Sequence, residues 1–420
     1  MSRRSRAVLL AVALGLACTE DPTAPGQCPD FCPPGDITLV DTLLTSVVVR
    51  DSGFRGYLAP QAAAVLIAAN VPGLVESRPV MRFQPLGTTV TLGTDTTQRP
   101  ILGTDSALFA LTFFRRDTTV GDLRVRLYRL PLAVDSTTTF GALAGPFTDS
   151  LVRTINLDSL IRRPLKRDPV TGDSVHVDST SVRLIVHLDS SQARFVAADS
   201  GHVAFGVRIQ ADSPTSVVLG ANESGDPPLI SWYFRVDSAG TTTRSSRDLA
   251  PQFDAYVFDP PPAALDSTLV VGGMPSSRSV VRIALPPALQ DSTQILRATL
   301  LLVPSSAAQG APRDSFTLVA HAVAADLGGK SPLIVSNIAS DSSYFGTAPV
   351  FMGSTDTVRI EITRILRRWA ADTGAPTTIV LRSGSEGVVL GEIRFQPSRH
   401  GTLRPTVRLT YAARFPFGIP

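Results

Sequence analysis

The side chains best suited to metal binding and catalysis are few and scattered in this 420-residue chain. The five histidines have no ligand-like spacing and stand at His176, His187, His202, His321 and His400. The sequence has no His-Glu-x-x-His zinc motif, no Gly-x-Ser-x-Gly nucleophile motif and no glycine loop typical of nucleotide binding. It therefore predicts no metal, no cofactor and no catalytic residue. The remote alternative is a glycoside hydrolase-like enzyme, whose paired carboxylates a linear sequence cannot reveal.

Three cysteines lie near the N-terminus, at Cys18, Cys28 and Cys32. The last two form a close pair, Cys28-Pro-Asp-Phe-Cys32, for which an oxidising compartment favours a disulfide. A zinc site would need two more soft ligands nearby, and this segment offers none. The pairing leaves Cys18 as the odd cysteine.

Residues 1–17 have the layout of an export signal. Three arginines precede an unbroken apolar run over residues 7–17, and a basic stub before 7–15 apolar residues is typical of a signal peptide. Eleven helical residues rise only about 16 Å, roughly half of a bilayer core, so a permanent span is not expected. We therefore expect the protein to be exported.

The end of that run, Leu14-Gly15-Leu16-Ala17-Cys18, resembles a lipoprotein signal box, in which the cysteine takes the lipid and becomes the new N-terminus. Here leucine stands four residues before the cysteine rather than the usual three. Residues 18–36 are polar and proline-rich, which is typical of a tether. We expect Cys18 to anchor the chain at the outer membrane or cell surface. Ordinary cleavage near Ala17 is the alternative, and it would yield a soluble periplasmic or secreted protein.

The charge of the mature chain argues against nucleic-acid binding. Without the three arginines of the signal, 36 basic residues face 36 acidic ones, although the whole chain has a formal charge of +3. Nucleic-acid binding needs a strongly basic face. With 43% hydrophobic residues the chain can build large cores, and its length allows two or three domains.

The pattern of the mature chain predicts an all-β fold. Short apolar segments alternate with polar residues at period two, the pattern of strands with one buried face. Clear examples are 123–128, 182–187, 296–303 and 407–411. The dipeptide Asp-Ser occurs fifteen times, and both residue types favour turns. Calcium loops are the alternative, but the Asp-x-Asp-x-Asp-Gly pattern is missing.

Residues 362–371 place Ile362, Ile365, Leu366 and Trp369 on one helical face, so we expect a helix there with Trp369 in the core.

The second half of the chain repeats the first loosely and in the same order. The matched segments are 78–83 with 278–283, 107–114 with 296–303, 138–142 with 342–347, 152–158 with 358–363, 217–220 with 388–391, and 227–233 with the closing strand at 404–411. We therefore expect two tandem antiparallel β-sandwiches, jelly-roll-like and each with one short helix. The expected boundaries are 37–238 for the first, 239–252 for the linker, 253–414 for the second and 415–420 for a tail. A polar insertion at 164–180 marks the first copy.

The second copy opens with Asp254-Ala-Tyr-Val257 and continues with a Leu-Val-Val-Gly strand, an Arg-x-x-x-Arg-Ile strand, a helix ending in Trp369 and the closing Pro-x-Val-x-Leu-Thr-Tyr411. In these features the second copy, 254–411, resembles the DNRLRE domain, a secreted β-sandwich, and the first copy is more diverged. The family's hallmark motif is not legible, and Glu361 replaces the usual Asp before the helix. The resemblance implies a bacterial surface protein that binds polysaccharide or matrix.

Two non-catalytic functions follow from these patterns. The first is an envelope-anchored surface module that binds polysaccharide or another envelope component. The second is a scaffolding lipoprotein that packs against other envelope proteins. The aromatic residues that line sugar platforms are scarce, since the chain has 2 Trp and 6 Tyr. Trp232 falls on a predicted strand, and Trp369 falls on a predicted core helix.

Overall fold

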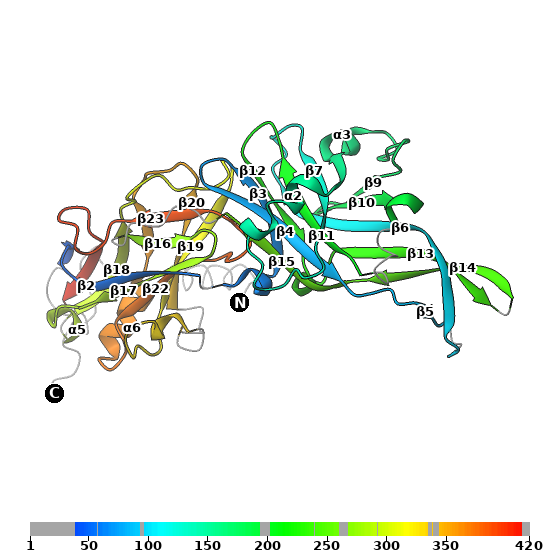
Figure 1. Ribbon diagram of the computed structural model, residues 1–420. Helices are drawn as coiled ribbons and strands as arrows, with labels where there is room; N and C mark the ends of the chain where they lie inside the picture. The colour runs from blue at the N-terminus through cyan, green and yellow to red at the C-terminus, as the bar shows by residue number, and fades with distance from the viewer. Residues whose placement is uncertain are drawn as a thin grey trace, which may run out of the picture.

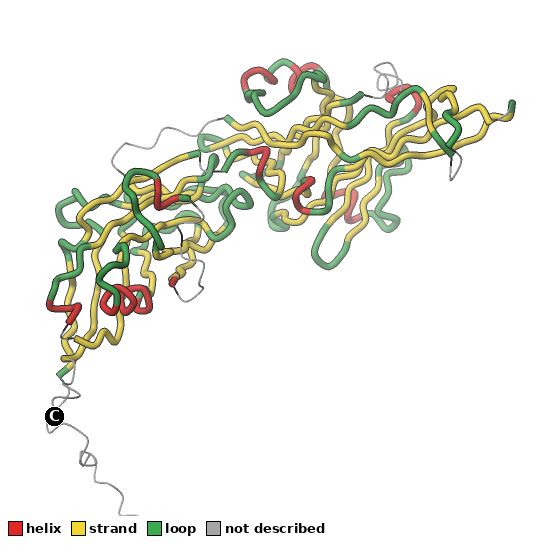
Figure 2. The backbone as a smooth tube through the Cα atoms, turned by 90° about the horizontal axis from the view of Figure 1, so that it is seen from below, coloured by secondary structure: helices red, strands yellow, loops and turns green. Residues whose placement is uncertain are grey.

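The computed structural model describes residues 38–56, 58–92, 96–193, 202–238, 240–259, 268–291, 293–334, 338 and 344–413. Over these residues the chain consists of antiparallel strands and a few short helices, which confirms the all-β prediction. The strands form two units that follow one another along an elongated, bent molecule (Figures 1 and 2). The expected signal peptide, tether and tail lie outside the described residues.

The first unit runs from β3 to β15. Its strands are β3 (Val65–Val71), β4 (Val75–Phe83), β5 (Thr89–Val90), β6 (Arg99–Arg116), β7 (Arg124–Leu130), β8 (Leu151–Asn156), β9 (Ser174–Val177), β10 (Val182–Leu188), β11 (Ala204–Gln210), β12 (Thr215–Gly220), β13 (Leu229–Ser238), β14 (Thr241–Leu249) and β15 (Pro251–Phe258). Its helices are α2 (Pro146–Asp149) and α3 (Leu157–Arg162), with 3₁₀ turns η1 (Pro60–Ala62), η2 (Gly141–Leu143) and η3 (Asn222–Ser224).

The second unit is built from the two ends of the described chain. Its strands are β1 (Leu39–Leu44), β2 (Val48–Arg55), β16 (Leu269–Gly272), β17 (Ser277–Ile283), β18 (Thr293–Leu302), β19 (Ser315–Ala322), β20 (Phe345–Phe351), β21 (Val358–Glu361), β22 (Thr378–Ser383), β23 (Glu392–Phe395) and β24 (Thr406–Ala413). Its helices are α5 (Ala288–Asp291) and α6 (Thr363–Ala371), with the 3₁₀ turn η4 (Ser331–Leu333). The expected helix at 362–371 is thus confirmed as α6, and the described residues contain further short helices, among them residues 190–193 of the first unit.

The N-terminal strands complete the second unit rather than the first. Strand β1 pairs with β24, with Leu39 opposite Ala412, and β2 pairs with β17, with Arg55 opposite Ser277. In Figure 1 the dark blue β2 lies among the strands of the C-terminal unit. We call residues 38–56 the N-terminal clasp, because it joins the start of the chain to its last unit.

Strand pairing therefore divides the chain differently from the sequence boundaries. Strand β15, which contains the expected opening of the second sandwich, pairs with β4 of the first unit. Strand β14 fills most of the expected linker at 239–252 and pairs with β13. Short motifs could not reveal this division, because a strand's sequence shows that it is a strand but not which strand it joins.

The two units share one order of strands, as a tandem repeat requires. The path β13-β6-β10 in the first corresponds to β24-β18-β21 in the second, and β4-β11-β7-β8 corresponds to β17-β22-β19-β20. In this order β8 matches β20, so the proposed match of 152–158 with 358–363 was wrong. Helices α3 and α6 also follow non-equivalent strands. The clasp matches β14 and β15, which pair with β13 and β4 in the first unit.

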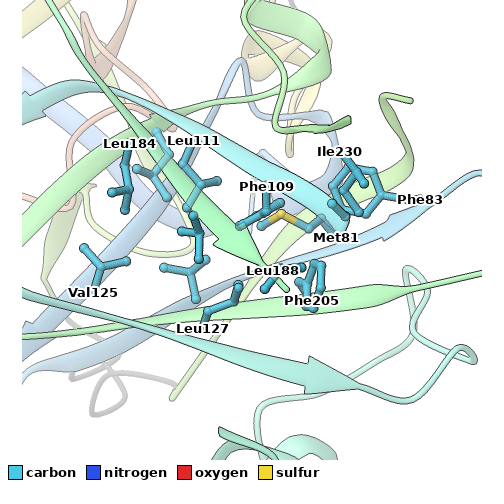
Figure 3. Packing of buried hydrophobic residues seen from close by; sticks show 14 of the residues in the cluster. Met81, Phe83, Phe109, Leu111, Val125, Leu127, Leu184, Leu188, Phe205 and Ile230 are labelled. Atoms are coloured by element: carbon cyan, nitrogen blue, oxygen red, sulfur yellow. The ribbon is translucent and has the colours of Figure 1, made fainter. Parts of the chain in front are cut away.

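Each unit has a large apolar core, made by the inward residues of its alternating strands. In the first, Phe83, Phe109 and Phe205 meet with ring centroids 5.1–6.4 Å apart, as Figure 3 shows. In the second, Trp369 of α6 is 1% exposed and packs among the strands. The core position of Trp369 is as expected, and Trp232, which is also 1% exposed, is a core residue of the first unit.

The units meet through a third apolar cluster with polar links beside it. Residues of both units, among them Ile67, Val218 and Leu390, pack together there. Beside this contact Asp314 of the second unit accepts a hydrogen bond from the Ser216 hydroxyl at 3.0 Å and lies 3.6 Å from Arg115 of the first. Burial raises the pKa of the Asp314 carboxyl, although Arg115 opposes the shift.

Several of the Asp-Ser pairs form the expected turns. The carboxylate of Asp135 accepts from the backbone N–H of Thr137, and that of Asp189 accepts from Ser191. Asp51 is different, because it lies within β2 and its carboxylate accepts from the backbone of Ser398. Asp105 within β6 and Asp158 within α3 do not form turns either, so the dipeptide marks a turn at only some of its positions.

Candidate functional site

The predicted covalent sites at Cys18, Cys28 and Cys32 lie outside the described residues. Within the described ranges no helix is long and apolar enough to cross a membrane. No cluster of three or more potential metal ligands occurs among the same residues.

The described histidines make separate local contacts and do not form a cluster. His176 is exposed and lies 2.9 Å from Asp178, and the imidazole of His400 accepts from the backbone of Leu403. His321 lies on β19 beside Arg382, where burial, together with the positive charge of Arg382, lowers its pKa to about 4. These contacts are structural, and only His187 lines one of the grooves described below.

Buried carboxylates are held by fixed partners. Asp158 bonds to Arg116 and to the backbone of Leu123. Asp254 accepts from the backbone and side chain of Asn222, and its burial raises the pKa of its carboxyl. These contacts give both groups a structural role at a turn or between strands.

An open groove of about 400 Å³ lies on the outer face of the first unit. Its walls are formed by β6, β10, β13 and the polar insertion, through Ser106, Leu108, Arg167, Gly172, Ser174, Ile185, His187 and Tyr233. These strands lie in the right-hand unit of Figure 1. We call this the Tyr233 groove.

Strand alternation explains why these side chains face outward. Trp232 and Phe234 point into the core, so Tyr233 between them points out, and it is 40% exposed. In the same way, Leu184 and Val186 are buried while His187 lines the groove. The alternation around Trp232 carried this signal in the sequence, but the sequence prediction did not include Tyr233 as a site residue.

The polar insertion forms the second wall of the groove and is fixed by hydrogen bonds. Its strand β9 pairs with β10. Buried Asp173 accepts from the backbone N–H of His187 at 2.8 Å and lies 3.8 Å from Arg153, which in turn donates to the His187 carbonyl. Gly172 has φ +79° and lies against His187, a conformation that favours glycine. The insertion is therefore packed onto the first unit and held there by these contacts.

The groove combines an exposed phenol ring with a guanidinium, an imidazole and two hydroxyls. An aromatic face offers a flat apolar surface, and the polar groups offer hydrogen bonds to a ligand. No Asp or Glu is among its lining residues. The groove is therefore suited to holding a polar ligand, and it lacks the carboxylate pair that glycoside hydrolysis requires.

The sequence matches the model of no known protein family, and it matches no curated protein.

Proposed function

We propose that this protein is a non-catalytic binding module held at the cell envelope, and that it binds polysaccharide in the Tyr233 groove. The observation that carries the proposal is the exposed Tyr233 ring, which stands beside Arg167 and His187 in an open groove with no lining carboxylate. Sugar rings present apolar C–H faces to an aromatic ring and hydroxyls to polar side chains, so this set of groups suits them.

The anchored location is part of the same proposal and rests on the signal-like sequence and on Cys18. In the folded chain β1, which follows the tether, lies in the second unit, while the Tyr233 groove lies in the first. An anchor at Cys18 would thus attach next to the second unit and leave the groove on the other one. Mass spectrometry of the mature N-terminus tests the anchor, and an unmodified terminus contradicts it.

The binding proposal is tested by passing the purified chain over immobilised neutral and acidic polysaccharides and over isolated cell walls. We expect retention on at least one polysaccharide, and elution by the same soluble glycan. Absence of retention on every polysaccharide would contradict the proposal.

A scaffolding function is the second candidate, and the edge strand β14 favours it. This strand ends the sheet order of the first unit, and nearly all its residues from Thr241 to Asp248 are exposed. An exposed edge can accept a strand from another protein. Cross-linking in intact cells separates the two candidates: a protein partner linked through β14 supports scaffolding, and recovery of the uncomplexed chain counts against it.

A further inference from the structure

A second cleft, of about 620 Å³, lies in the second unit between the start of α6 and strands β18 and β20. Its lining includes three arginines, Arg297, Arg364 and Arg367, and one acidic residue, Glu361. Helix α6 and β18 can be found in the left-hand unit of Figure 1. We call this the arginine cleft.

The positive charge of the cleft is only partly neutralised. Glu361 pairs with Arg297 at 3.2 Å, and its other oxygen accepts hydrogen bonds from Thr363. Arg367 donates to the backbone carbonyls of Ile295 and Leu296, at 2.7 and 3.2 Å. Neutral carbonyls hold this guanidinium in place without cancelling its charge.

Arg364 adds a second uncompensated charge. It is exposed, lies one turn before Arg367 on α6, and forms no ion pair with a described residue. The guanidiniums of Arg364 and Arg367 are neighbours on α6, and neither is paired with a carboxylate of a described residue. Such a pair favours an anion with several acceptor oxygens, such as a phosphate group.

The walls of the cleft also expose apolar surface. Leu296 and Phe345 are 36% and 38% exposed. Leu296 follows Ile295, which aligns through Tyr411 with Val40 of the clasp strand β1. The same clasp strand exposes further leucine side chains, Leu39 at 59% and Leu43 at 52%.

We propose that the arginine cleft binds the phosphate headgroups of a lipid surface. The phosphate lies between Arg364 and Arg367, and the exposed Leu296 and Phe345 contact the boundary of the acyl chains. The charge complementarity of the cleft carries this inference, together with the exposed leucines of β1, which lies in the same sheet as β18 and is separated from it by β24. The orientation also rests on the proposed anchoring, because the tether that would carry the lipid leads into β1.

The test is co-sedimentation of the chain from residue 18 onwards, without the signal-like residues 1–17 and with Cys18→Ser, with vesicles of phosphatidylcholine alone or with phosphatidylglycerol added. We expect binding only to the anionic vesicles, weakened by high salt. Since each arginine near such a surface contributes about 1 kcal/mol, Arg364→Gln should reduce partitioning about five-fold. The matched control is Arg359→Gln, an exposed arginine on β21 outside the cleft, which should have little effect.

Equal binding to both vesicle types, or equal losses for Arg364→Gln and Arg359→Gln, would overturn the proposal. A third outcome would also overturn the proposal: inorganic phosphate shifts the amide signals of α6, but the chain binds neither vesicle type. That result would indicate a soluble phosphate compound as the ligand instead. Polysaccharide retention at the Tyr233 groove is measured separately, so failure here leaves that result intact.

Discussion

Replacing Arg55 in the clasp should destabilise the second unit selectively. Arg55 lies 3.1 and 3.2 Å from the two carboxylate oxygens of Glu392, whose side chain is only 4% exposed. Loss of one partner from a fully buried pair costs about 3–5 kcal/mol. Here Arg394 remains 2.7 Å from the carboxylate, and Arg55 itself is 25% exposed. We therefore expect Arg55→Met to cost about 2 kcal/mol, below the fully buried range.

The two tryptophans allow each unit to be followed by itself, because Trp232 lies in the first core and Trp369 in the second. In a Trp232→Phe background, urea unfolding monitored by Trp369 fluorescence should show a midpoint lowered by about 1 M, given a slope of about 2 kcal/mol/M. The control is Arg50→Met, since Arg50 is an exposed arginine on the same strand β2. A shift for Arg55→Met no larger than that for Arg50→Met would refute the reasoning.

Three further outcomes follow from the second unit. Deleting residues 1–56 removes strands β1 and β2, so Trp369 fluorescence should report a loosened core. A peptide of residues 38–56 added in excess should restore the native fluorescence. A native signal without the peptide would argue against the clasp. Trp369→Ala should cost about 3–5 kcal/mol by urea unfolding, because the ring is fully buried; a cost below 1 kcal/mol contradicts its core position. The fold lowers the pKa of His321 from 6.5 to about 4, so the unfolded chain takes up the proton at a higher pH than the folded chain does. The free energy of unfolding should therefore fall as the pH drops from 6.5 towards 4. His321→Phe should flatten that pH dependence in unfolding titrations, whereas replacing exposed His176 should leave it unchanged.

The secondary structure and the core were largely accessible from the sequence. Period-two alternation identified strands such as β10 and β24, and period-3.6 spacing identified α6 with Trp369 inward. Both signals are local, since each depends on which face of a strand or helix is buried.

Pairing partners were not accessible in the same way. Nothing in the clasp residues indicates that β1 joins β24 across the whole chain, because register is set by contacts between distant segments. The same reason accounts for the wrong match of 152–158 with 358–363, where a similar local pattern occurs on strands with different neighbours.

The two grooves were hidden for a related reason. Tyr233, Arg167 and His187 stand far apart in sequence and meet only when β13, β10 and the insertion assemble. The same helical spacing that turns Trp369 inward leaves Arg364 and Arg367 on the solvent side of α6. It could not show that Glu361 would be engaged by Arg297, which leaves the other two without a carboxylate.

The binding account is tested most directly by the affinity of single variants for the polysaccharide that retains the chain. Tyr233→Ala removes the exposed ring of the groove, and Phe351→Ala removes a 60% exposed ring on β20 of the other unit. Loss of a central aromatic contact costs more than 1 kcal/mol, so we expect about a ten-fold weaker Kd for Tyr233→Ala, with unchanged unfolding curves. Phe351→Ala should bind like the parent chain. Equal affinity for Tyr233→Ala and the parent chain would contradict the assignment of the groove.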